Sequence, residues 1–148
     1  MTVYKHILLA TDLGDKSAMV AQKAAELASL HRAKFSIAHV TEYTPPFYGI
    51  GEVAVPIDLD TEDELEHEAH QKIKALVQKL ALKKATIWVL CGEKNEEIVK
   101  LIKEQKVDLI IVGGHHHHGL NLLFGSSLPS VMLHHLLCDI LVINLGAV

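Results

Sequence analysis

Short apolar runs alternate along the chain with longer amphipathic segments. The fourth run, just before a pair of glycines, is apolar without any alternation. Such a run is typical of a parallel strand that is covered on both faces. The pattern predicts five strands, at Lys5–Ala10, Lys34–Val40, Ala85–Leu90, Asp108–Val112 and Asp139–Leu145.

The segments between these runs carry apolar residues three or four positions apart, which predicts amphipathic helices. The first helix is expected from about Lys16 to His31. Thr61 and Glu64 form a capping-box pattern at the start of the second helix, and Gly92 and Asn95 introduce a short third helix. The apolar positions are Leu65, Ala69, Ile73, Leu76 and Leu80 in the second helix, and Ile98, Leu101 and Ile102 in the third.

The order of these elements predicts the fold class. Ser126 or Ser127 is expected to cap a last helix, so strands and helices alternate along the whole chain. This alternation implies parallel strands joined by right-handed crossovers. We therefore predict an α/β fold, a five-stranded, doubly wound, Rossmann-like parallel sheet with helices on both faces. The length of 148 residues favours one domain spanning residues 1–148.

The segment Thr41–Asp60 departs from the regular alternation. Prolines and glycines prevent regular structure through much of it. A connection of this length in a compact domain is usually functional or mobile. Because it follows the second strand, it is either a flap over a site at the carboxyl end of that strand or a packed surface excursion.

Composition and charge exclude some classes of protein. Hydrophobic residues make up 49% and charged residues 22% of the chain, and the net charge of −4 gives no reason to expect nucleic acid or an anionic membrane as the main partner. No apolar run is long enough to span a bilayer, and Ile7–Ala10 is too short for a signal-peptide core. With no secretion signal, the distant cysteines Cys91 and Cys138 favour a reduced, cytoplasmic setting.

The stretch Val107–Ser127 contains the main candidate for chemistry. Its buried strand gives way to Gly113-Gly114, then to His115–His118, and then to a Gly-Ser-Ser turn. In open α/β sheets, ligands bind beyond the carboxyl ends of the strands, where the strand order reverses, and helix starts there present N–H groups to anions. We therefore expect the ends of strands one, two and four to surround one crevice, formed by Ala10, Thr11, Asp12, Val40, Thr41 and Val112 to His116.

Asp12 has two interpretations at this position. Its carboxylate suits a ribose hydroxyl, an adenine amine or a magnesium ion, but it also suits a helix cap or an Asx turn. The chain has no nucleophile elbow, no P-loop lysine motif and no H-E-x-x-H metal motif. We therefore predict no catalytic residue.

Several stretches together resemble the universal stress protein family. They are YKHILLATDLGDKS, AKFSIAHV and VDLIIVGGHHHHGLNLLFGSSLPSVMLHHLLCDILVINL, and the resemblance covers essentially the whole chain. It implies a small cytoplasmic α/β protein with five parallel strands. It also implies a homodimer paired through the last strand, here Asp139–Leu145, and a role in survival under stress without an agreed enzymatic reaction.

One branch of that family binds ATP through a glycine, two residues, a second glycine, nine residues and Gly-Ser. Counted from Gly113, the second glycine falls on His116, and the final pair falls on Ser126-Ser127 or, with a small deletion, on Gly125-Ser126. A histidine adds a Cβ and an imidazole where glycine lets the backbone approach phosphate. The chain thus looks more like the A-type branch, in which ATP binding is generally absent. By similarity, the adenine and ribose positions are Thr11, Asp12, Val40, Val112 and Gly113, and the phosphate end is Ser126 and Ser127.

Three functional hypotheses follow. The leading one is a non-catalytic, homodimeric stress-response or regulatory protein that acts with protein partners, requires no cofactor and binds adenine nucleotides weakly or not at all. The alternative is a switch that binds ATP or AMP with magnesium and hydrolyses ATP slowly. The third is metal binding by His115–His118, because imidazole is a common ligand of zinc, copper and nickel, although a solvated or pH-sensitive loop is also open for this run.

Overall fold

The computed structural model describes residues 3–42, 59–116 and 137–147, with the backbone alone described for residues 59–62, 115, 116 and 147. Within these ranges, strands and helices alternate as the apolar pattern predicts. None of the helices in these ranges combines the length and the hydropathy needed to cross a membrane. The elements are β1 (His6–Ala10), α1 (Ser17–His31), β2 (Lys34–Thr41), α2 (Leu59–Lys79), β3 (Thr86–Cys91), α3 (Lys94–Gln105), β4 (Leu109–His116) and β5 (Asp139–Ala147).

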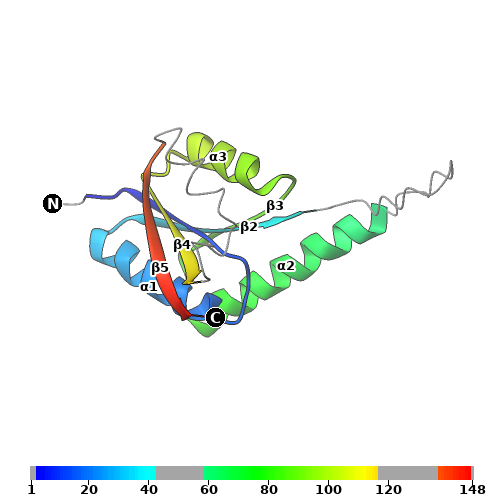
Figure 1. The fold of residues 1–148 in the computed structure, drawn as a ribbon, viewed down its shortest axis with the longest axis horizontal. Coiled ribbons are helices and arrows are strands. Elements are labelled where there is room, and N and C mark those ends of the chain that lie inside the picture. The colour runs from blue at the N-terminus through cyan, green and yellow to red at the C-terminus, as the bar shows by residue number, and fades with distance from the viewer. Residues whose placement is uncertain (1–2, 43–58, 117–136, 148) are drawn as a thin grey trace.

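The five strands form one parallel sheet in the order β3-β2-β1-β4-β5. The chain proceeds outward from β1 through β2 to β3, then crosses back and proceeds the other way through β4 to β5. Figure 1 shows α1 and α2 on one face of this sheet and α3 on the other. The predicted five-stranded, doubly wound sheet with helices on both faces is therefore confirmed.

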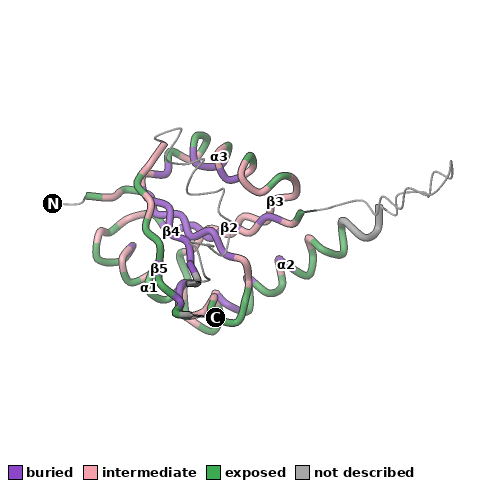
Figure 2. The backbone as a smooth tube through the Cα atoms, in the orientation of Figure 1, coloured by how far each residue is buried: buried purple, intermediate pink, exposed green. Residues whose placement is uncertain are grey.

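The central strand β1 divides the core between the two faces because its side chains alternate. Ile7 and Leu9 pack with α1 and α2, whereas Leu8 and Ala10 pack with α3. The first three of these side chains are fully buried and Ala10 is 1% exposed. Figure 2 shows the buried backbone concentrated in the central strands, as expected for a strand covered on both sides.

Two expectations about α2 are wrong. The helix begins at Leu59, so Thr61 lies inside it and does not cap it. No proline or glycine stands between Ile57 and Thr61, and the acidic residues that follow suit the positive end of the helix dipole, so the helix extends further towards the N-terminus. Leu65 is 38% exposed, whereas the later stripe residues Ala69, Ile73 and Leu76 are buried. Figure 1 shows that the first turns of α2 extend past the sheet.

Two further predictions fall outside the described residues. They are the last helix after Ser126 or Ser127 and most of the Thr41–Asp60 connection, whose residues 43–58 are not described. Both stay predictions.

His6 is a buried polar residue at the amino end of β1. Its ring is 5% exposed; Nδ1 donates to the Gln105 carbonyl oxygen over 2.9 Å, and Nε2 lies 2.8 Å from the Ser36 hydroxyl. These bonds join β1 to β2 and to the end of α3. Burial, the largest cause, lowers the pKa of His6 below its ordinary value of 6.5.

We expect His6→Leu to destabilise the fold by about 1–3 kcal/mol, because the Ser36 hydroxyl and the Gln105 carbonyl would lose their partner in the interior. The lowered pKa also gives a pH dependence. The unfolded chain takes up the proton first as the pH falls below 6.5, so the stability due to neutral His6 is complete above that pH and decreases below it.

Urea unfolding at pH 8.0 and pH 5.5 measures both effects. The difference in unfolding free energy between the two pH values should be smaller in His6→Leu than in the native chain. The exposed His67, replaced by leucine, is the control and should keep the native difference. Equal differences in all three proteins would contradict the assignment.

Candidate functional site

The strand order reverses between β1 and β4, and the predicted site residues lie at the carboxyl edge of the sheet at this point. The register pairs Leu9 with Ile111, but β1 ends at Ala10 whereas β4 continues to His116. The last residues of β4 therefore extend beyond β1. This is the place in a doubly wound sheet where ligands bind.

The expectation that the fourth strand ends at Val112 is wrong. Gly113 and Gly114 continue the strand and pair with Ile143 and Asn144 of β5, with an irregularity in the register between Gly114 and His116. The physical reason is that β5 continues beside β4 and provides partners for the backbone hydrogen bonds of these glycines. The glycines are therefore part of the sheet edge.

Thr11 and Asp12 form the turn that leaves β1. The Thr11 hydroxyl accepts the Leu13 N–H over 3.1 Å, and Asp12 Oδ1 accepts the Gly14 N–H over 2.8 Å. The Asx-turn interpretation of Asp12 is thus confirmed. A Cβ at Gly14 would stand 3.1 Å from Asp12 Oδ1, so a larger residue there would crowd the carboxylate.

Val40 and Val112 lie at the same edge, but their side chains point into the core. They are 3% and 1% exposed and pack in the cluster beneath α3. β1 pairs with β2 on one side and with β4 on the other. The carboxyl ends of β2 and β4 therefore lie on either side of the residues that follow β1, which begin with Thr11. A ligand in this crevice would contact the two valines through backbone atoms.

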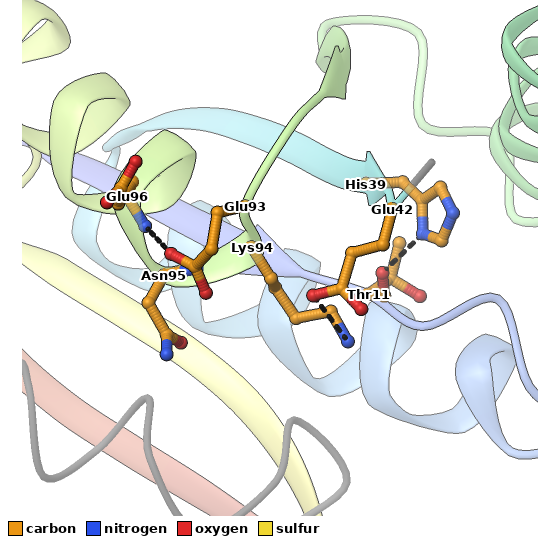
Figure 3. Close-up of polar contacts among 7 residues, drawn as sticks. All are labelled: Thr11, His39, Glu42, Glu93, Lys94, Asn95 and Glu96. Carbon is orange, nitrogen blue, oxygen red and sulfur yellow. Dashed lines mark hydrogen bonds and ion pairs between the residues drawn. The ribbon is translucent and has the colours of Figure 1, made fainter. Parts of the chain in front are cut away.

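His39 is a residue of this edge that sequence reasoning missed. Its Nδ1 donates to the Thr11 carbonyl oxygen over 2.8 Å, while the Thr11 N–H donates to the Ala38 carbonyl oxygen over 2.9 Å. Figure 3 shows the ring lying against the end of β1. The two bonds fix the start of the Thr11–Gly14 turn to β2.

Charged groups from two segments lie near this edge (Figure 3). Glu93 caps α3 by accepting the N–H groups of Asn95 and Glu96 over 3.2 and 2.7 Å. Lys94 Nζ lies 3.9 Å from Glu42 Oε1, so the start of α3 is joined to the residue after β2. The sequence placed Gly92 and Asn95 at the helix start but gave no sign of the Lys94–Glu42 pair.

Lys16, just before α1, donates a hydrogen bond to the Leu145 carbonyl oxygen on β5. This contact joins the first helix to the last strand across the carboxyl edge. No motif in the sequence indicated Lys16, because it precedes the first helix and lies far from the glycine loop along the chain.

The remaining predicted site residues are only partly covered by the structure. The backbone of His116 lies at the end of β4, opposite Ala147. Gly125, Ser126 and Ser127 lie outside the described residues, so the phosphate end of the predicted site stays a prediction. In the part of the chain that is described, no three histidine, cysteine or acidic side chains are grouped to hold a metal ion.

Comparison with known proteins agrees with this fold. The model of the universal stress protein family matches residues 3–144. Universal stress protein A homolog 1 of Coxiella burnetii is 36% identical over 140 residues, which cover 95% of this chain and 96% of that protein.

Solved structures share the same fold. A universal stress protein from Archaeoglobus fulgidus in complex with dAMP has a TM-score of 0.57 at 22% identity, over 96% of this chain and 98% of that chain. A universal stress protein in complex with cAMP has a TM-score of 0.59 at 22% identity, over 95% and 96% of the two chains.

We expect Glu93→Ala to destabilise the protein by about 1 kcal/mol, because two N–H groups at the start of α3 would lose their acceptor. Urea unfolding measures this loss. Glu96→Ala is the matched control, since it removes a carboxylate from the same helical turn and keeps the cap, and it should cost only about 0.3–0.5 kcal/mol. Equal losses in the two variants would mean that charge alone, and not the cap, stabilises this end.

Proposed function

Because the chain belongs to the universal stress protein family, we propose that it is a small non-catalytic regulatory protein of the stress response that acts as a cytoplasmic homodimer. The observation that carries this proposal is the way the polar side chains at the carboxyl edge of the sheet are bonded. There the polar groups of Thr11, Asp12 and His39 hold the turn in shape through hydrogen bonds to backbone atoms.

The cysteines support a role without nucleophilic chemistry. Burial, the largest cause, raises the pKa of the Cys138 thiol to about 11, so the thiol stays protonated near neutral pH and is a poor nucleophile. Cys91 and Cys138 are not joined in a disulfide.

The crevice between β1 and β4 supports a weak adenine-nucleotide site. Relatives of the same fold are known in complex with dAMP and with cAMP. The Asp12 turn and the strand ends that carry Val40, Val112 and Gly113 lie at this edge. His116 stands at the end of β4, where a glycine would let the backbone approach phosphate closely. We therefore propose that adenosine contacts are kept while the phosphates are held poorly.

A second candidate is a nucleotide switch that binds ATP or AMP with magnesium and hydrolyses ATP slowly. The nucleotide complexes of the relatives favour it, and Asp12 is the carboxylate that would meet the metal ion. A third candidate, metal binding by His115–His118, rests on the sequence alone.

The last strand supports the homodimer. β5 stands at one edge of the sheet, and its Leu141 and Val142 are 39% and 40% exposed. An apolar edge strand invites pairing with another chain and is an aggregation hazard when it is left uncovered. Pairing of two β5 strands would cover it. Partner proteins of other kinds would then bind elsewhere on the dimer.

For the nucleotide site, we expect the native chain to bind ATP with magnesium no more tightly than the millimolar range in calorimetric titration. His116→Gly should bind ATP about tenfold more tightly, since that gain corresponds to roughly 1.4 kcal/mol of relieved obstruction. Its adenosine affinity should stay unchanged.

His116→Ala keeps the Cβ and is the control that separates the imidazole from the backbone effect. Micromolar binding of ATP by the native chain would contradict the proposal and favour the switch. A His116→Gly variant whose affinity for ATP equals that of the native chain would also contradict the proposal.

For the dimer, we expect Val142→Glu to convert the protein into a folded monomer, because a carboxylate at the centre of the paired edge would be desolvated without a partner. Light scattering after gel filtration measures the mass, and circular dichroism checks the fold. Leu30, which is 78% exposed on α1, is the control, and Leu30→Glu should remain dimeric. A dimeric Val142→Glu protein would overturn the proposed interface.

A further inference from the structure

A cavity of about 780 Å³ lies at the amino edge of the sheet, opposite the site described above. It is bounded by the last turns of α1, the first residues of β2, and the turn that joins α2 to β3. Because parallel strands all start at the same edge, this cavity is separated from the nucleotide crevice by the length of the sheet. Its volume is in the range of sites that hold small molecules, roughly 300–1,000 Å³.

The floor of the cavity is apolar. Phe35 and Ala28 are 8% and 3% exposed, and the half-buried Leu82 packs with them in the core cluster beneath α1 and α2. Much of the remaining lining is alanine, and these short side chains leave the space between the two helix ends open. The alanines are Ala25, Ala28, Ala33, Ala81 and Ala85.

The two helices that end beside the cavity present few unsatisfied carbonyl oxygens to it. Arg32 follows the end of α1 in the left-handed conformation, and the N–H groups of Arg32 and Ala33 donate to the carbonyl oxygens of Ser29 and Ala28 over 3.0 and 2.8 Å. In the turn after α2, the N–H groups of Ala81 and Leu82 donate back to residues 78 and 77 over 3.2 and 2.9 Å. Paired N–H bonds of this kind are the usual way to satisfy the last carbonyls of a helix.

The two helix ends contribute only about half an elementary negative charge each, so the four cationic side chains at the rim outweigh them. Arg32, Lys34, Lys83 and Lys84 surround the opening, and no aspartate or glutamate is among the described residues that line it. None of these four cations takes part in an ion pair within the described ranges. The concentration of positive charge is notable because the whole chain carries a net charge of −4.

We propose that this cavity binds a small amphipathic anion, a carboxylate attached to an apolar chain. The carboxylate lies at the rim, where the Arg32 guanidinium can donate two hydrogen bonds to its oxygens and the lysines add positive charge. The apolar chain lies on Phe35 and Leu82, where it is removed from water. An inorganic anion would leave this floor uncovered, and a neutral apolar molecule would leave the cations without a counter-charge.

Calorimetric titration of the full-length protein with decanoate, decanol and inorganic phosphate tests the proposal, with the detergent-like ligands kept below the concentration at which they aggregate. We expect decanoate to bind at least tenfold more tightly than either of the others. Decanol binding as tightly as decanoate would show that the cations play no part, and phosphate binding as tightly would show that the floor plays none. Either result, or no binding of decanoate, overturns the proposal.

Paired variants locate the site. The double variant Lys83→Glu with Lys84→Glu should weaken decanoate binding at least tenfold. Lys100→Glu with Lys103→Glu, which makes the same change of charge on the exposed side of α3, should leave it unchanged. An equal loss of decanoate affinity in both double variants would indicate that the net charge of the protein alone attracts decanoate, and it would overturn the proposed location of the site.

A second variant tests the cavity without changing any charge. Ala25→Leu adds three heavy atoms to the wall of the cavity and should also weaken decanoate binding at least tenfold. Thermal unfolding of the variant checks that it folds, and Ala85→Leu on the opposite wall provides the same test if it does not. Unchanged affinity in a folded variant of this kind would overturn the proposed location.

Discussion

The carboxylate of Asp108 sets the register of the central strands. Its two oxygens accept the N–H groups of Lys5 and His6 over 2.7 and 2.9 Å. The Asp108 N–H donates to the His6 carbonyl oxygen, and the Asp108 carbonyl oxygen accepts the Asp139 N–H. One residue thus joins the amino ends of β1, β4 and β5. A slip of one position would turn every buried side chain of β1 to the wrong face.

The register fixed at one edge of the sheet determines the geometry of the other. Since Ile7 is opposite Leu109 and β1 ends at Ala10, β4 must extend past β1 at the carboxyl edge. The proposed nucleotide site lies where the two strands differ in length, at the point of strand reversal. The amino edge is shaped in another way, by two helices that end beside it and by alanines that leave space between them. The two candidate sites are therefore consequences of different features of one sheet.

The elements could be predicted from the sequence because both kinds leave a local pattern: strands covered on two faces give unbroken apolar runs, and amphipathic helices place apolar residues three or four positions apart. The end of β4 could not, because Gly113 and Gly114 are locally typical of a turn, and only the neighbouring β5 keeps them in the sheet. The polar contacts of the site could not be predicted from the sequence either. Lys16 and Leu145 are 129 positions apart, and His39 and Thr11 are 28 apart. Such contacts depend on the order and register of strands, which no local spacing encodes.

The structural role of Asp12 in the turn after β1 is compatible with its proposed role in binding. Its Oδ1 accepts the Gly14 N–H, and within the described ranges no hydrogen bond reaches Oδ2. The bond to Gly14 prevents rotation of the carboxylate, and the hydrogen bonds of Thr11 to Leu13, Ala38 and His39 hold the backbone that carries it. A group fixed before the ligand arrives loses less entropy on binding. The Asx turn would therefore hold Asp12 ready for the proposed contact with a ribose hydroxyl or an adenine amine, so the two interpretations of Asp12 are compatible.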